Sequence, residues 1–268
     1  MVRLHGPAIV MLCVALAGPM ALRAAEPIGQ AVHIETSVTG DGQTLAVKDP
    51  VHRDERIRTS QSGLGQFVFR DGTKLAVGWG SSVVIDRFVY DDRNSLKKLT
   101  ITAAKGTFRW VSGSSKSTAY EILTPAGTIG VRGTAFDFYV GRDGTTAMVL
   151  LNGYASFCGS RGCRQLTRRC DCIVASRNGG ISDPRRVNRD LLRTLGNTRA
   201  LPFLSGDQTL TGGLHYGGCR LEAAVRDTTR PRPAPKKAPP DKPPPDKPPP
   251  DKPPPDRPDR PDRPDKPR

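Results

Sequence analysis

The feature that most constrains the fold is the segment 124–134, Thr-Pro-Ala-Gly-Thr-Ile-Gly-Val-Arg-Gly-Thr, with the alternating run 135–140 that follows it. Gly127, Gly130 and Gly133 recur every three residues, a spacing that suits backbone bends better than a helix or a flat sheet. No nucleophile, general base or metal-ligand cluster accompanies these glycines. We therefore expect an extracytoplasmic β domain here and not an active site.

Two tight turns are predicted at Asp71-Gly72 and Asp143-Gly144, because these dipeptides adopt the positive φ values that short hairpins need. Apolar residues two apart flank both turns and share a face of their strands. The expected core positions are Phe67, Phe69, Leu75, Val77, Phe136, Phe138 and Val140, with Met148 and Leu150 or their neighbours on the returning strand.

Strand-like runs recur at intervals of about ten to fifteen residues, which is typical of an all-β domain. Residues 96–103 and 107–111 are expected as two strands joined by a turn at Lys105-Gly106. Helical periodicity is absent through this region. The predicted fold class is all-β, either a β-sandwich or a short solenoid-like stack of hairpins.

The segment 124–140 resembles the signature of FecR-type domains, and further blocks in the same order extend the resemblance over residues 30–157. These blocks are residues 54–59, 65–78, 81–91 and 146–157. The resemblance implies a FecR-like β domain at residues 26–157 whose motif residues have structural or contact roles. They are Thr124, Pro125, Thr128, Ile129, Gly130, Arg132, Gly133 and Thr134.

Arg132, held between two glycines, has two alternative interpretations. It contacts a ligand as an exposed cation, or it pairs within the domain with a carboxylate such as Asp137 or Asp86. The structural pairing is the favoured prediction.

Residues 1–25 have the composition of a secretory signal peptide. Arg3 and His5 precede the apolar run 8–17, and small residues follow, so cleavage is expected near Ala24 or Ala25. The apolar run is shorter than the ~20 residues that a membrane-spanning helix needs. The mature protein is therefore expected in the periplasm or secreted.

Full-length FecR regulators combine a cytoplasmic anti-sigma segment, one membrane helix and an extracytoplasmic domain. Here a leader stands where the anti-sigma segment would be, so the resemblance does not imply direct control of a sigma factor. Many exported proteins reuse the domain as an interaction module, and this is the function that the resemblance implies.

Residues 158–229 are expected to form a basic extension that contains the cysteines of the mature chain: Cys158, Cys163, Cys170, Cys172 and Cys219. Disulfides are the default in an oxidising compartment. A local Cys158–Cys163 bridge is geometrically easy, and either Cys170 or Cys172 is expected to pair with Cys219. Because five is an odd number, one thiol is expected to remain free, to pair between chains or to belong to a site. A zinc site is the disfavoured alternative, because the cysteine spacings do not match paired two-residue knuckles.

One helix is predicted at residues 183–196, with Asp183 as its cap, Pro184 at its first position and Gly196 ending it. Its apolar stripe is expected to pack on the β domain. The stripe comprises Val187, Leu191, Leu192 and Leu195.

Residues 230–268 contain 18 of the 25 prolines of the chain, with repeats of Asp-Lys-Pro-Pro-Pro, and are predicted to be a disordered proline-rich tail. Charge is uneven along the chain. The net charge is +2 for residues 26–157, +6 for residues 158–229 and +5 for the tail.

Export argues against nucleic acid as the partner of these basic segments. We expect instead an envelope protein or glycan as partner, with a weak contact to anionic lipid or cell-wall polymer. The alternative is a structural envelope element anchored through the tail. No cofactor, metal or catalytic residue is expected, since His33, His52 and His215 are far apart in sequence and lie in no recognisable catalytic setting.

Overall fold

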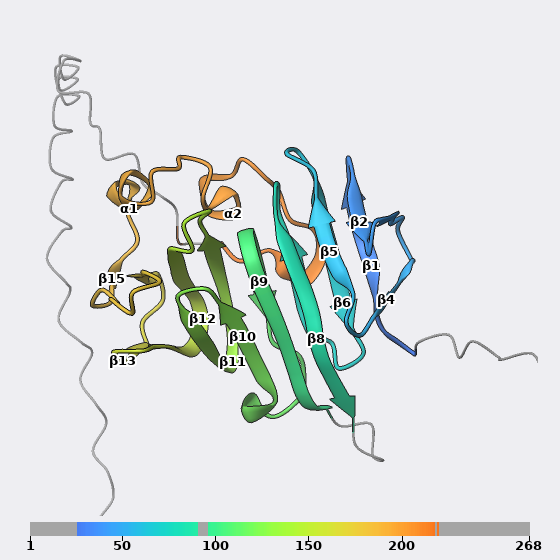
Figure 1. The fold of residues 1–268 in the computed structure, drawn as a ribbon, viewed down its shortest axis with the longest axis horizontal. Helices are drawn as coiled ribbons and strands as arrows, with labels where there is room; N and C mark the ends of the chain where they lie inside the picture. Colours follow the sequence, from blue (N-terminus) through green and yellow to red (C-terminus); the bar gives the residue numbers. More distant parts are fainter. Residues whose placement is uncertain (1–25, 91–95, 218, 220–268) are drawn as a thin grey trace, which may run out of the picture. The chain divides into compact units, whose positions relative to one another are not determined.

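The computed structural model describes residues 26–90, 96–217 and 219. Fifteen strands in this part of the chain form one continuous hydrogen-bonded sheet, which confirms the all-β prediction (Figure 1). Only the β9–β10 pairing is parallel among the described strands. The strands are β1 Pro27–Glu35, β2 Val38–Gly40, β3 Gln43–Thr44, β4 Pro50–His52, β5 Arg56–Thr59, β6 Leu64–Phe69, β7 Lys74–Val77, β8 Ser82–Tyr90, β9 Leu96–Val111, β10 Tyr120–Thr124, β11 Gly127–Val140, β12 Thr146–Gly159, β13 Gly162–Leu166, β14 Asp171–Ala175 and β15 Arg185–Arg186.

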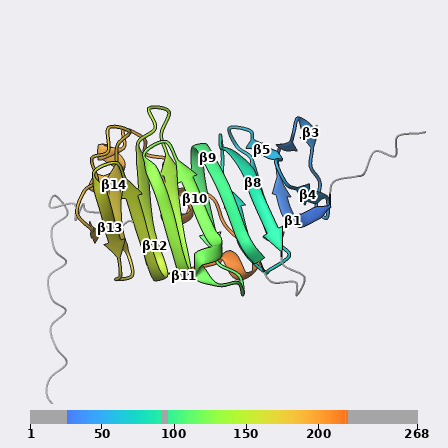
Figure 2. The ribbon, with the colours of Figure 1, turned by 60° about the horizontal axis from the view of Figure 1, so that its bottom comes forward.

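Three long strands, β9, β11 and β12, belong to both layers of a sandwich (Figure 2). The first half of β9 pairs with β8 and β10, whereas its second half pairs with β7 and the second half of β11. Likewise, β12 pairs with β14 in its first half and with β13 in its second half. The sheet thus folds over on itself into two layers. The first layer contains β8, β10 and β13, and the second layer contains β6, β7 and β14.

The two layers enclose one apolar core. Phe69 of β6 lies 6.1 Å from Phe88 of β8, measured between ring centroids, although these strands are not neighbours in the ladder. All nine core positions predicted around the two hairpins are buried in this cluster, and both predicted turns are present. These predictions are confirmed.

The predicted turn at Lys105-Gly106 is wrong, because both residues lie inside the continuous strand β9. Gly106 has a φ of +111° and sits at the point where β9 passes from one layer to the other. The backbone there does change direction, but by bending within a strand and not by reversing. Gly133, with a φ of +57°, occupies the corresponding position in β11.

The expected domain boundary after residue 157 falls inside β12, which continues to Gly159. The next strands, β13 and β14, add to the first and second layers, respectively. The first part of the basic extension therefore completes the sandwich. All described residues belong to one contact unit, Met1–Ala224.

The predicted helix at 183–196 is shorter than expected. Helix α1 spans Arg189–Thr194 and is capped by Asn188, whose side chain accepts a hydrogen bond from the Leu191 amide. Pro184 lies outside it because Arg185–Arg186 extends to pair with β14 as β15. The predicted apolar stripe nevertheless packs on the second layer, with Leu191 buried and Leu192 and Leu195 partly buried.

Two disulfides join described cysteines, Cys158–Cys163 and Cys170–Cys219. The first closes the β12–β13 hairpin, and the second ties the end of the described chain to the residue before β14. Cys172 has the free thiol among the cysteines in the described ranges; it is buried, and burial raises its pKa to about 12.

Alanine substitutions at the two bends should differ in cost. A Cβ at Gly133 meets no atom within 4 Å. Gly133→Ala should therefore lower the free energy of unfolding by about 1–2 kcal/mol, mainly because alanine disfavours the left-handed backbone conformation. At Gly106 a Cβ would lie 2.4 Å from the Ser81 Cα, so Gly106→Ala should cost about 3 kcal/mol or more. Urea unfolding measures both values; equal losses would contradict the bend at Gly106.

Cys172 should be inert in the folded protein. With a pKa of about 12, roughly one thiol in 10,000 is ionised at pH 8, and the group is covered by the α1 region. In protein lacking residues 1–25, an aromatic disulfide reagent should label no thiol until guanidinium unfolds the chain and then label one. The Cys172→Ser variant should give no signal in either state, and rapid labelling of the folded wild type would contradict this placement.

Candidate functional site

The motif singled out from the sequence forms the β10–β11 hairpin in the first layer. Pro125 and Ala126 make the two-residue turn, since Thr124 pairs with Gly127 across the ladder. The Thr124 hydroxyl donates a 2.8 Å hydrogen bond to the Gly127 carbonyl and closes the turn. This part of the motif shapes the backbone.

The rest of the motif packs and bends β11. Ile129 is fully buried, and Gly130 leaves room for Ser156 of β12, whose hydroxyl oxygen lies 2.6 Å from where a Cβ would stand. Thr128 precedes them in the same strand and is half-buried. Beyond the bend, the Thr134 hydroxyl donates to the Asn152 carbonyl at 2.6 Å.

The predicted internal pairing of Arg132 is wrong. Asp137 pairs with Arg109, and Asp86 accepts a hydrogen bond from the Thr102 hydroxyl. Arg132 is exposed and has no ion-pair partner among the described residues. Val131, the residue before it, is buried, whereas Arg132 and Gly133 at the bend are exposed.

The ion pair of Arg109 and Asp137 is buried on the side of the second layer that faces away from the core. Two hydrogen bonds join the groups, 2.5 Å from Nε to Oδ1 and 2.7 Å from Nη2 to Oδ2. Burial raises the pKa of Asp137, and the guanidinium of Arg109 opposes that shift. The side chains are 3% and 0% exposed, respectively, so another segment must cover them.

That segment is residues 197–214, which we call the strap (Figure 1, orange). It includes helix α2, Pro202–Ser205, and the 3-10 turn η2, Gly212–Leu214. The Leu214 carbonyl accepts a 3.0 Å hydrogen bond from Arg109, and the Phe203 ring lies 5.5 Å from the Arg109 guanidinium carbon. The strap thus satisfies a third donor of the buried arginine.

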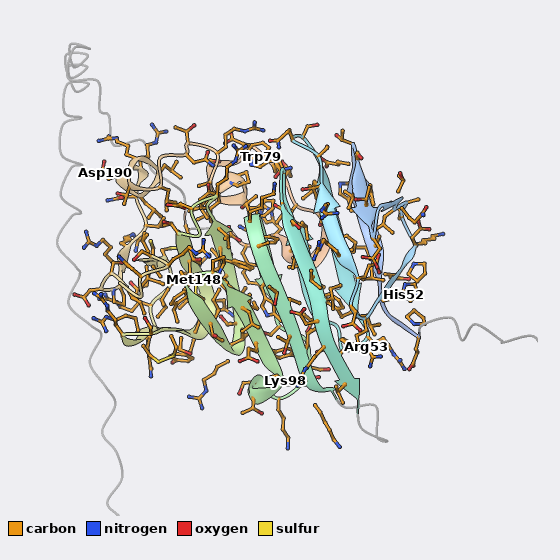
Figure 3. All side chains as sticks on the ribbon, viewed as in Figure 1. His52, Arg53, Trp79, Lys98, Met148 and Asp190 are labelled. Atoms are coloured by element: carbon orange, nitrogen blue, oxygen red, sulfur yellow. A yellow bond between two sulfur atoms is a disulfide. The ribbon has the colours of Figure 1, made fainter. Side chains whose placement is uncertain are left out.

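The strap is also fixed at its first residues, next to Trp79 at the edge of the fold beside α2 (Figure 3). The Arg199 guanidinium stacks 3.7 Å from the Trp79 ring centroid, and the Trp79 indole donates to the Arg199 carbonyl at 3.1 Å. Arg199 also donates to the Gln61 carbonyl at 3.3 Å. These contacts connect residues 120 and 138 positions apart.

A half-open pocket of about 220 Å³ lies where the strap meets the bend of β9 and the β11–β12 hairpin. Lys105, Arg142 and Arg199 bring three cationic side chains to it. None of the residues that line it in the described part of the chain is acidic. The other lining residues are Gln61, Trp79, Gly80, Gly106, Thr107, Tyr139, Val140 and Asn197.

Hydrogen-bond donors outnumber acceptors among the polar side chains of this pocket. The Tyr139 oxygen accepts from the Asn197 amide at 3.0 Å, which leaves its own hydrogen free to donate. The Asn197 side-chain oxygen is already used by the Arg199 amide at 2.9 Å. The Thr107 hydroxyl is buried and has no hydrogen-bond partner among the described residues. This pocket is the candidate functional site.

Sequence reasoning missed this pocket, because its cations come from three segments that no local pattern connects. The one local signal was Trp79-Gly80, an aromatic residue beside a glycine in a loop between two strands.

The described histidines do not form a second site. His33 hydrogen bonds to Glu35 at 2.8 Å, and His52 lies 3.6 Å from Glu55, measured from Nδ1 to Oε2. Burial raises the pKa of Glu55, which packs against Gly40. In the described ranges, no three His, Cys, Asp or Glu residues group as metal ligands, and no helix is long and apolar enough to cross a membrane.

Removing one partner of the buried pair should be more damaging than removing both. Arg109→Met leaves the Asp137 carboxyl buried without its counter-ion and should cost about 3–5 kcal/mol in urea unfolding. Arg109→Met/Asp137→Leu should lose less. A loss in the double variant as large as the sum of both single losses would show that the two groups do not interact.

The same single variant should have a diagnostic pH dependence. A carboxyl whose folded pKa is raised favours folding in its protonated form, and this contribution is lost as pH rises through the folded pKa. Arg109→Met should therefore recover part of its deficit when the pH is lowered, relative to the double variant. A constant difference between the two variants would contradict the prediction.

Comparisons with known proteins find a family model that matches the central part of the chain. The family model described as FecR protein matches residues 55–156. No curated protein matches the chain significantly.

Two crystal structures of a protein from Parabacteroides distasonis, provisionally described as an anti-sigma factor and determined at 2.50 and 1.65 Å resolution, resemble the chain. The TM-scores are 0.41 and 0.40, each at 14% sequence identity, over 53% of this chain and 64% and 65% of those chains. This chain therefore spans less than two thirds of their length.

The matched range runs from just before β5 through all but the last residues of β12, and so contains the three long strands and the motif hairpin. Residues 55–156 of this chain therefore match the model of the FecR family and are similar to its domain.

Proposed function

We propose that this protein is an exported, non-enzymatic binding module of the bacterial envelope, with a sensory or scaffold role. The FecR domain at residues 55–156 carries the proposal, because such domains serve as extracytoplasmic interaction modules. The partner is another envelope protein or a glycan.

Export is supported by two independent features. The signal-like leader at residues 1–25 lies outside the described residues, but its composition is that of a secretory signal. The two disulfides suit an oxidising compartment such as the periplasm, because cytosolic proteins seldom keep structural disulfides.

A non-enzymatic role agrees with the chemistry of the described residues. The motif hairpin shapes the backbone, the buried ion pair is satisfied within the protein, and the candidate pocket contains cations and donors but no paired acid and base. Such a pocket suits binding.

The basic, proline-rich segment from residue 230 favours a second candidate, in which the protein is a structural envelope element anchored to cell-wall or other anionic polymers. That segment lies outside the described residues. Contacts of this kind are electrostatic and weaken with salt.

A crosslinking pulldown from envelope fractions should separate the two. The mature chain and a version ending at Thr229 should capture the same membrane protein or glycan, and capture should survive 0.5 M salt, roughly a Debye length of 4 Å. Recovery of cell-wall material alone, lost with the tail or with salt, would sink the binding-module proposal and favour anchoring.

A further inference from the structure

The pocket between the strap and the bend of β9 gathers three positive charges, and the match to the FecR model gives no role for them. Lys105 and Arg142 are exposed cations with no ion-pair partner in the described ranges, and Arg199 adds a third positive charge held against Trp79. Three like charges around 220 Å³ repel one another, so an anion in the pocket would relieve an unfavourable interaction.

A neutral group favours the same kind of ligand. The Tyr139 hydroxyl hydrogen is a donor without an acceptor, whereas the Thr107 hydroxyl is buried too deeply to reach the space of the pocket. A ligand that supplies several acceptor oxygens and a negative charge would satisfy the Tyr139 hydroxyl and the cations together. Carboxylates and phosphates do this, and arginine binds both with paired hydrogen bonds.

The geometry holds the site in place before any ligand arrives. The indole of Trp79 fixes the strap through the Arg199 carbonyl at 3.1 Å, and the Asn197 side chain links the strap to Tyr139 of β11. Gly106 packs so closely against Ser81 that a Cβ on it would clash with that residue. This close packing holds the bend of β9 at one wall of the pocket. The cations therefore project from a fixed frame, which reduces the entropy lost on binding.

Size restricts the ligand. A volume of 220 Å³ equals about seven waters at roughly 30 Å³ each, which exceeds a bare ion but is smaller than drug-sized pockets of about 300–1,000 Å³. The pocket is half open, so the remainder of a longer molecule can extend into solvent.

We propose that this pocket binds the carboxylate or phosphate group of a small anionic ligand through Lys105, Arg142 and Arg199, with Tyr139 donating to its oxygens. The inference rests on the proposed function, for which it supplies a ligand class. The same chemistry occurs in sugar acids and in phosphate esters.

The test is a titration of the full chain with glucuronate and with glycerol phosphate, followed by calorimetry and by tryptophan fluorescence, with sodium chloride at matched ionic strength as the blank. At least one probe should bind saturably at micromolar to millimolar concentration. The stronger probe identifies the charged group as a carboxylate or a phosphate.

Lys105→Gln/Arg142→Gln should weaken that binding by about a hundredfold, roughly tenfold for each charged donor lost. The matched control Arg87→Gln/Lys97→Gln removes the same charge from exposed positions. Lys97 lies eight residues from Lys105 along β9, about 26 Å at 3.3 Å per residue. The control should bind as the wild type does.

Absence of saturable binding by either probe would overturn the proposal, as would equal binding by the pocket variant or equal weakening in the control. Both pocket positions are exposed, so an unchanged urea midpoint verifies folding. Envelope crosslinking of the same variant separates the two proposals. If a partner is captured but no anion binds, the ligand inference fails and the binding-module proposal stands. If an anion binds but no partner is captured, the ligand inference stands and the binding-module proposal fails.

Discussion

The whole fold depends on three strands that each belong to both layers of the sandwich. β9, β11 and β12 must bend sharply without breaking their ladders, and residues such as Gly106 and Gly133 adopt the positive φ values that allow it. Because the layers share these strands, neither layer can form its core face alone. Both therefore contribute to a single apolar cluster.

The range that matches the FecR model contains only part of this arrangement. Residues 55–156 include the crossing strands, but β1 and β14, which flank the second layer, lie outside them. The strap then covers the outer side of that layer, where the Arg109–Asp137 pair would otherwise be exposed to partial solvation. Segments outside the range that matches the FecR model thus complete the sandwich of this chain.

Local chemistry predicted much of this fold. The Asp71-Gly72 and Asp143-Gly144 turns, with alternating apolar residues on either side, identified two hairpins and nine core positions. Prediction failed where a distant partner decided the local structure. Lys105-Gly106 has turn composition, but pairing on both sides of it keeps β9 continuous.

Similarly, residues after Pro184 have a helical pattern, but pairing with β14 makes the first of them a strand. The candidate site was harder still to foresee. Its residues meet because Trp79 stacks on Arg199 and because Asn197 reaches Tyr139, contacts that span 120 and 58 positions. Nothing in a local window specifies which distant arginine will stack on a half-buried tryptophan.

The Cys170–Cys219 disulfide has a mechanical consequence for this arrangement. A pulling force applied through the residues after Cys219 enters the fold at that cysteine and passes directly to Cys170, next to β14. The strap lies within the loop that this bond closes, so the load bypasses it. Tension on the proline-rich segment would therefore load the second layer next to β14 and leave the contacts around Trp79 unloaded.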